Sequence, residues 1–230
     1  MSTPKNPNTI LITNKFYPDG LKEIDIWSYY NLYKGIILNQ TRGRDLMFAI
    51  ATGENQIALK RKGVDSKFLT LTNSNYENMV HGRVLTIYST MKMYEDICVL
   101  DIDIDDFNKA KDATHDVYMT CSKSPLFSDA IIKYSGKQSF HIVCKLARKT
   151  NIDSIRMIAN NFLRKTDLTK KYTIEAKRKS GIANIDLSVN KFRGAFITLN
   201  SLSIWGLKCM EVPFNKLSSF NQSMAKIKVA

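Results

Sequence analysis

The chain has 230 residues, of which 44% are apolar, and its 34 Lys and Arg against 21 Asp and Glu give a formal net charge of +13. This composition is typical of a globular protein and excludes collagen-like and intrinsically disordered chains. No apolar run approaches the about 20 residues of a membrane helix. Residues 1–7 have no signal-peptide pattern, and the four cysteines form no C-x-x-C pair. We therefore expect an intracellular protein with free thiols and no membrane partner.

The excess of cations favours a polyanionic partner, mainly nucleic acid, because neutralising phosphates releases counterions. A basic surface that serves solubility alone is the alternative. The charge is uneven along the chain: acids concentrate in residues 101–106, and the cations cluster in Lys60-Arg61-Lys62, Lys170-Lys171 and Lys177-Arg178-Lys179. A basic protein with one acidic segment is typical of an enzyme that holds phosphate groups through metal ions.

Taken in chain order, the pattern predicts a polar tail over residues 1–9 and a turn at Pro18-Asp19-Gly20. Apolar residues at helical spacing predict helices over 24–40, 106–122 and 151–165. Strands are predicted over 46–51, 56–59, 68–72, 84–89, 99–106, 130–134, 140–145, 172–175, 182–187 and 195–199. The stretch after Pro213 predicts one short helix. No linker divides the chain, so we expect a single domain over 1–230 of the mixed α/β (α+β) class, with largely antiparallel sheets and flanking helices.

The strand predicted over 99–106 alternates aliphatic and acidic residues, so Asp101 and Asp103 point to the same face. Two ionised carboxylates on one face repel each other unless one is protonated or a cation lies between them. Carboxylate oxygens suit Mg²⁺ or Mn²⁺, which bring phosphate groups with them. The alternative is a half-exposed edge strand whose acids only face water.

Two further segments carry groups that suit phosphate chemistry. Residues 135–141 form a small polar turn before a strand, and they offer backbone N–H groups, the Ser135 hydroxyl and the His141 imidazole. A structural histidine beside a strand is the alternative there. In residues 185–194, Asp186 would complete a three-carboxylate metal site, and Arg193 would meet phosphate oxygens.

With these three segments in this order, the sequence resembles the archaeo-eukaryotic primase superfamily, and most closely the polymerase domain of ligase D. The resemblance covers about residues 10–215. The other matching segments are Lys15-Phe16-Tyr17-Pro18, Lys22, Tyr29-Tyr30, Arg42-Gly43-Arg44, Leu59-Lys60-Arg61 and the basic stretch from Lys177 to Asp186.

The resemblance implies a primase-like catalytic core with an RRM-like half, acting as a template-dependent nucleotidyltransferase that uses NTP or dNTP. Asp101, Asp103 and Asp186 would hold two Mg²⁺ or Mn²⁺ ions. The residues implied to contact the incoming nucleotide are Ser135, Lys137, His141, Asn190 and Arg193. Lys15 and Lys22 would bind a 5′-phosphate, and Arg44 and Lys60 would contact DNA. The implied partners are primer-template, gapped or broken DNA, together with a separate ligase or end-binding protein.

The chain departs from the family pattern at three places. Gln138 replaces a lysine, which shifts the expected triphosphate contact to Lys137. Ile57 and Ala58 replace a pair of aromatic residues, and 201–205 lacks two arginines. Three functions stay open: gap filling in end joining, primer synthesis de novo, and a nucleic-acid-binding module without catalysis. A metal-dependent glycosyltransferase using Asp101 and Asp103 fits the basic charge poorly.

Overall fold

The computed structural model describes residues 6–63, 65–174 and 181–229 and divides the chain into two compact units. Unit 1 consists of the segment that ends at Thr90, Ala195–Met210 and the segment that begins at Asn221. Unit 2 consists of Met91–Gly194 and Glu211–Phe220. Both units are discontinuous in sequence. Whether they act as the expected single catalytic domain stays a prediction.

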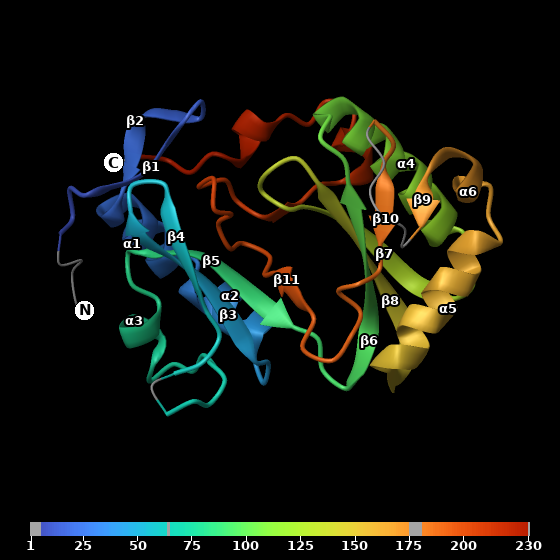
Figure 1. The fold of residues 1–230 in the computed structure, drawn as a ribbon, viewed down its shortest axis with the longest axis horizontal. Helices are drawn as coiled ribbons and strands as arrows, with labels where there is room; N and C mark the ends of the chain where they lie inside the picture. The colour runs from blue at the N-terminus through green and yellow to red at the C-terminus, as the bar shows by residue number, and fades with distance from the viewer. Residues whose placement is uncertain (1–5, 64, 175–180, 230) are drawn as a thin grey trace. The chain divides into compact units, whose positions relative to one another are not determined.

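Unit 1 contains a two-stranded sheet and a four-stranded antiparallel sheet of order β11-β5-β3-β4 (Figure 1). Its elements are β1 (Ile10–Asn14), β2 (Tyr17–Lys22), α1 (Glu23–Leu32), α2 (Lys34–Thr41), β3 (Leu46–Gly53), β4 (Gln56–Lys60), α3 (Tyr76–Met79), β5 (Val84–Thr90), β11 (Ala195–Ile197) and the 3-10 helix η2 (Gln222–Ala225).

A buried tyrosine joins distant segments of unit 1. The Tyr30 hydroxyl on α1 donates to the Leu85 carbonyl oxygen at 2.7 Å and accepts from the Leu202 N–H at 3.1 Å. The Tyr76 hydroxyl on α3 donates in turn to the Tyr30 carbonyl oxygen at 2.8 Å. Each hydroxyl is therefore satisfied inside the core, as buried polar groups must be.

Unit 2 is organised around a six-stranded sheet of order β12-β7-β8-β6-β10-β9. In it the pairs β7–β8, β8–β6 and β6–β10 are antiparallel, and the pair β10–β9 is parallel. Its elements are β6 (Tyr94–Asp103), α4 (Phe107–Ser122), β7 (Phe127–Tyr134), β8 (Phe140–Asn151), α5 (Ile152–Arg164), α6 (Leu168–Lys171), β9 (Thr173–Ile174), β10 (Asn184–Asp186) and the 3-10 helix η1 (Phe214–Lys216). The edge strand β12 (Met210–Glu211) begins at the last residue of a unit 1 segment and ends at the first residue of a unit 2 segment. Figure 1 shows α4 and α5 on one side of this sheet. The expected mixed class with antiparallel sheets is confirmed.

The core of unit 2 lies between the sheet and these two helices. Phe107 of α4 stacks on Phe140 of β8 with ring centroids 5.6 Å apart. Cys98, Cys121 and Cys144 are fully buried in the same core and are free thiols, as expected. Burial raises the pKa of the Cys98 thiol, so it stays protonated. Within the described parts of the chain, no helix is long and apolar enough to cross a membrane.

Three local predictions are wrong. The first turn comes at Lys15 and Phe16 because the Asn14 side chain accepts hydrogen bonds from the Phe16 and Tyr17 N–H groups at 2.8 and 3.3 Å, and Pro18-Asp19-Gly20 lies in β2. The helix predicted over 24–40 is divided into α1 and α2 at Tyr33. Residues 68–72 form only isolated β-bridges at Phe68 and Leu69.

Candidate active site

Strand β6 brings Asp101 and Asp103 to the sheet face opposite α4 and α5. Leu100 and Ile102, which alternate with them, are almost fully buried at 1% and 0% exposure. The two aspartates are half-buried. Because successive side chains of a strand point to opposite faces, the apolar residues fill the helix-covered core and the acids are left on the other face.

The sheet register aligns four chemically active residues in one row across this face. Asp101 pairs with Asp186 of β10 on one side and with His141 of β8 on the other. His141 pairs in turn with Lys133 of β7. Neighbouring strands lie about 4.8 Å apart, so the row Asp186, Asp101, His141, Lys133 places carboxylates next to an imidazole and an ammonium group.

His141 is the buried centre of this row. Its Nε2 atom lies 3.5 Å from Asp101 Oδ1, and its side chain is 8% exposed. Burial, and secondly the charge of Lys133, hold the pKa of His141 well below its usual 6.5. The imidazole is therefore neutral at pH 7, so its contact with Asp101 is not an ion pair. The buried Nδ1 atom has no hydrogen-bond partner among the described residues.

The Asp186 carboxylate forms hydrogen bonds with a residue two positions later in the chain. Its carboxylate accepts hydrogen bonds from the Ser188 N–H at 2.6 Å and from the Ser188 hydroxyl at 2.9 Å. In the described ranges, no three or more His, Cys, Asp or Glu side chains come close enough together to hold one metal ion. The donor set still fits a divalent cation chemically, because Asp101, Asp103 and Asp186 offer hard oxygen ligands from neighbouring register positions. A metal ion bound there would compete with Ser188 for the Asp186 carboxylate oxygens.

The loop between β7 and β8 is closed by its own serines. The Ser135 hydroxyl donates to the Ser139 carbonyl oxygen at 2.8 Å, and the Ser135 N–H donates to the same oxygen at 3.1 Å. Gly136 has a φ of +87°, a conformation that favours glycine. Lys137 is exposed in this loop, and its carbonyl oxygen accepts from the Tyr134 hydroxyl at 2.7 Å. The predicted polar turn is present, and it contains the exposed Lys137.

Asn190 is fully buried, and its amide completes the hydrogen bonding of β6. Its Oδ1 atom accepts from the Val99 N–H at 2.8 Å, and its Nδ2 donates to the Val99 carbonyl oxygen at 2.6 Å and the Leu187 carbonyl oxygen at 3.2 Å. The Asn190 side chain therefore hydrogen-bonds both backbone groups of Val99 in β6, just after β10 ends at Asp186. The predicted nucleotide contact of Asn190 competes with these bonds.

Replacing Asn190 by alanine is expected to lower the free energy of unfolding by about 2–4 kcal/mol, because the buried N–H and C=O of Val99 would lose their partner. Urea unfolding measures this change. Lys191→Ala, an exposed position in the same turn, is the control and should change stability by less than about 0.5 kcal/mol. If Asn190→Ala left stability unchanged and raised only the KM for nucleotide, Asn190 would be a nucleotide contact instead.

Arg193 follows in the same loop with a φ of +59°. Its N–H donates to the Met91 carbonyl oxygen at 2.9 Å, and its guanidinium carbon lies 4.8 Å from the centre of the Phe192 ring. The predicted phosphate contact of Arg193 stays a prediction.

The four residues expected to contact DNA lie in unit 1. Lys15 is exposed in the turn of the β1–β2 hairpin, and Lys22 is at the last residue of β2, so the two occupy opposite ends of the hairpin. The Arg44 Nη1 atom donates to the Thr90 carbonyl oxygen at 2.8 Å. Lys60 is exposed at the end of β4. The cluster Lys177-Arg178-Lys179 lies outside the described residues.

Lys133 is the site residue that the sequence reasoning missed. It is 3% exposed and lies next to His141 in the sheet register. The available signal was a lysine within the predicted apolar strand over 130–134, because a lysine is rarely buried and a buried ammonium group requires a partner.

Comparison with known proteins adds one finding. No family model matches the sequence, and no curated protein matches it significantly. A solved structure does match: the polymerase domain of ligase D from Mycobacterium tuberculosis, in complex with DNA, superposes with a TM-score of 0.77. The match covers 94% of this chain and 88% of that chain at 12% sequence identity. The chain has a primase-polymerase fold. At 12% identity the match shows the fold of the chain, and any statement about its chemistry must come from the site residues.

Proposed function

We propose that this protein is a metal-dependent, template-directed nucleotidyltransferase of the primase-polymerase type, which extends or fills short gaps on DNA. The observation that carries the proposal is the row of Asp186, Asp101 and His141 on one sheet face, with Asp103 two residues along β6. This row lies in a chain that has the fold of a polymerase domain whose structure was solved with DNA.

In this proposal the three aspartates hold the metal ions. Mg²⁺ or Mn²⁺ bound there would neutralise the triphosphate and make the primer 3′-hydroxyl more acidic. The carboxylates would position the cations on the sheet face opposite α4 and α5, where carboxylates without a cation repel each other.

Neutral His141 and the closed loop after β7 serve the incoming nucleotide. The unsatisfied Nδ1 of His141 is a buried polar atom that a ligand hydrogen bond would satisfy. Lys137, exposed in the loop, supplies a cation for the triphosphate. The Ser135 hydroxyl fixes the loop through Ser139 and contacts the nucleotide only if that bond is exchanged.

DNA binding is supported by the net charge of +13 and by the DNA-bound fold neighbour. The finer proposal is gap filling in double-strand-break end joining, together with a separate ligase or end-binding protein. Lys15 and Lys22 would contribute to recognition of a downstream 5′-phosphate, each from its own end of the hairpin.

The experiment is nucleotide incorporation in Mn²⁺ or Mg²⁺ with NTP and dNTP on two substrates. One is a gapped duplex with a downstream 5′-phosphate, and the other is an unprimed single strand. We expect extension on the gapped duplex and a decrease when the 5′-phosphate is removed. Products on the unprimed strand would instead show a primase.

The second candidate is a DNA-binding module without catalysis. It is favoured by the Asp186 carboxylate, both of whose oxygens accept hydrogen bonds from Ser188. DNA binding with no incorporation on either substrate, in either metal, would select this candidate.

A further inference from the structure

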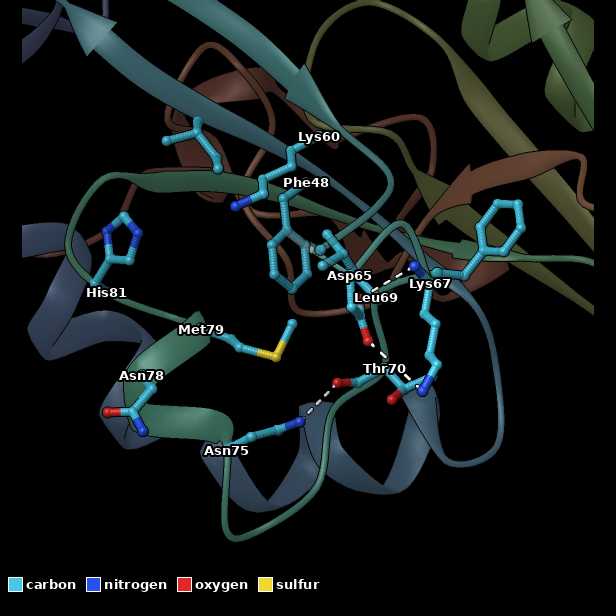
Figure 2. Close-up of a pocket in the computed structure, with 13 residues that line it drawn as sticks. Phe48, Lys60, Asp65, Lys67, Leu69, Thr70, Asn75, Asn78, Met79 and His81 are labelled. Carbon is cyan, nitrogen blue, oxygen red and sulfur yellow. Dashed lines mark hydrogen bonds and ion pairs between the residues drawn. The ribbon is translucent and has the colours of Figure 1, made fainter.

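Unit 1 contains a pocket of about 440 Å³ formed by β3, the end of β4, the segment that follows β4, and α3. Phe48 and Ile50 of β3 are apolar residues of its lining. Figure 2 shows the Phe48 ring facing the pocket. Figure 2 also shows the Met79 thioether pointing toward the Phe48 ring. A pocket of this size with apolar walls and a few polar groups at its rim is typical of a small-molecule or nucleotide site. Nothing in the proposed catalytic row uses it.

The rim of the pocket is cationic. In Figure 2 the Lys60 side chain extends between His81 and Phe48, and Lys60 forms no ion pair with any residue that the structure describes. Lys67 lies on the other side of the pocket, where its side chain is 84% exposed and its Nζ atom lies 3.8 Å from Asp65 Oδ2. Lys60 therefore offers an ammonium group to a ligand phosphate.

Hydrogen-bond donors and acceptors complete the rim. Partial burial, and then the charges of Arg83 and Lys60, lower the pKa of His81 against the opposing effect of Glu23. His81 Nδ1 accepts from the Arg83 N–H at 3.3 Å, so Nε2 of the neutral ring carries the proton and can donate to a ligand. Asn78 is exposed at the rim and has no hydrogen-bond partner in the described part of the chain.

We propose that this pocket binds one unpaired nucleotide, with the base against Phe48, Ile50 and Met79 and the phosphate at Lys60. A nucleobase is flat and apolar on its faces and polar on its edges, which matches an apolar wall with an amide and an imidazole at the rim. The inference rests on the proposed function only in taking nucleic acid or its precursors as the ligand. The nucleotide comes either from a single strand of DNA or from the free pool.

The direct test is NMR of the protein with ¹³C-labelled methionine methyl groups. The Met79 signal is assigned from its loss in Met79→Leu, and Met47 on β3, which does not line the pocket, is the internal reference. The probes are thymidine 5′-monophosphate, a short single-stranded oligothymidylate, the same sugar-phosphate chain without bases, and an acidic peptide. Stacking of a base should move the Met79 methyl signal upfield and leave Met47 unchanged.

A shift with the oligonucleotide alone identifies a DNA strand as the source, and a shift with the monophosphate identifies the free pool; both support the site. An equal shift with the base-free chain, a shift with the acidic peptide alone, or no shift with any probe would overturn it. The result is independent of catalysis. If the Met79 methyl signal does not move in a protein that incorporates nucleotides, only the pocket proposal is refuted. If the signal moves in a protein that does not incorporate nucleotides, only the proposed polymerase function is refuted.

Matched charge variants provide a second readout. Lys60→Gln should weaken binding of the oligonucleotide, or of the monophosphate where that is the ligand, about tenfold, because an ammonium–phosphate bond is lost. Lys62→Gln removes the same charge two residues later, but Lys62 lies over the Phe68 ring and does not line the pocket, so we expect about a threefold loss. If titration shows that the two variants lose the same binding affinity, the ligand is held by general electrostatic attraction and the pocket proposal is wrong.

Discussion

Replacing Asp101 and Asp103 together by asparagine is expected to reduce nucleotide addition about a thousandfold while the protein stays folded. Carboxylate ligands supply several kcal/mol of the stabilisation that a metal-assisted phosphoryl transfer needs, and the neutral amide supplies little of it. Single-turnover incorporation on the gapped duplex measures the loss. Asp105→Asn is the matched control, since Asp105 is exposed and lies beyond the end of β6.

Thermal unfolding separates loss of metal from loss of structure. Without metal, the double variant should be as stable as the original protein or more stable, because the two half-buried carboxylates repel each other. Mn²⁺ at a hundredfold excess over its Kd should then stabilise the original protein and Asp105→Asn by about 2.7 kcal/mol, which raises their unfolding midpoints. The midpoint of the double variant should not rise. Undiminished synthesis by the double variant would contradict the assignment of these residues.

Replacing Gly194 by alanine is expected to lower the free energy of unfolding by about 3 kcal/mol, one of the larger effects available in this chain. A Cβ atom at Gly194 would overlap the Val189 carbonyl oxygen and lie 3.0 Å from the Lys191 carbonyl oxygen. The atoms that the Cβ would meet are backbone atoms. The Gly194 backbone is also fixed, because its N–H donates to the Lys191 carbonyl oxygen at 2.7 Å and its carbonyl oxygen accepts from the Met91 N–H at 2.8 Å. No flexible side chain can move to relieve the clash.

Gly35→Ala is the control for this substitution. Gly35 lies inside α2, and a Cβ atom there would meet nothing within 4 Å. Alanine is favoured over glycine in a helix by up to about 1 kcal/mol, so this variant should be more stable. The two changes are the same in chemistry and opposite in sign, and urea unfolding distinguishes them. A loss of similar size in both variants would refute the steric explanation for Gly194.

The elements that the sequence predicted best are those with a strict hydrophobic period. The helix α4, which begins after the N-cap Asp106, follows the predicted range closely, because one hydrophobic repeat decides which side chains face the core and local capping agrees with it. The acidic strand β6 was predicted in type, but it spans Tyr94–Asp103 and shares only residues 99–103 with the predicted range. The expected antiparallel sheets follow from the same patterns.

The errors occur where tertiary contacts override local signals. Pro-Asp-Gly is a strong turn sequence, yet Pro18 and Asp19 lie exposed in β2, a two-stranded sheet that tolerates proline at its edge. Asn190 and Lys133 depend on which strands become neighbours, and a linear sequence does not contain that information. Asp186 pairs with Asp101 in the sheet register, which agrees with the position that the resemblance to the primase superfamily implied. The hydrogen bond of Asp186 to Ser188 is a side-chain detail that a motif does not define.

The discontinuity of unit 1 has a consequence for synthesis on the ribosome. Strand β5 is flanked by β3 and by β11, which lies about a hundred residues later in the chain. The Ile87 N–H of β5 donates to the Ser201 hydroxyl at 2.7 Å, and Ser201 is synthesised after β11. While unit 2 is being translated, the apolar strand β5 presents an unpaired edge to other chains, which makes the nascent protein most vulnerable to aggregation before residue 197 emerges.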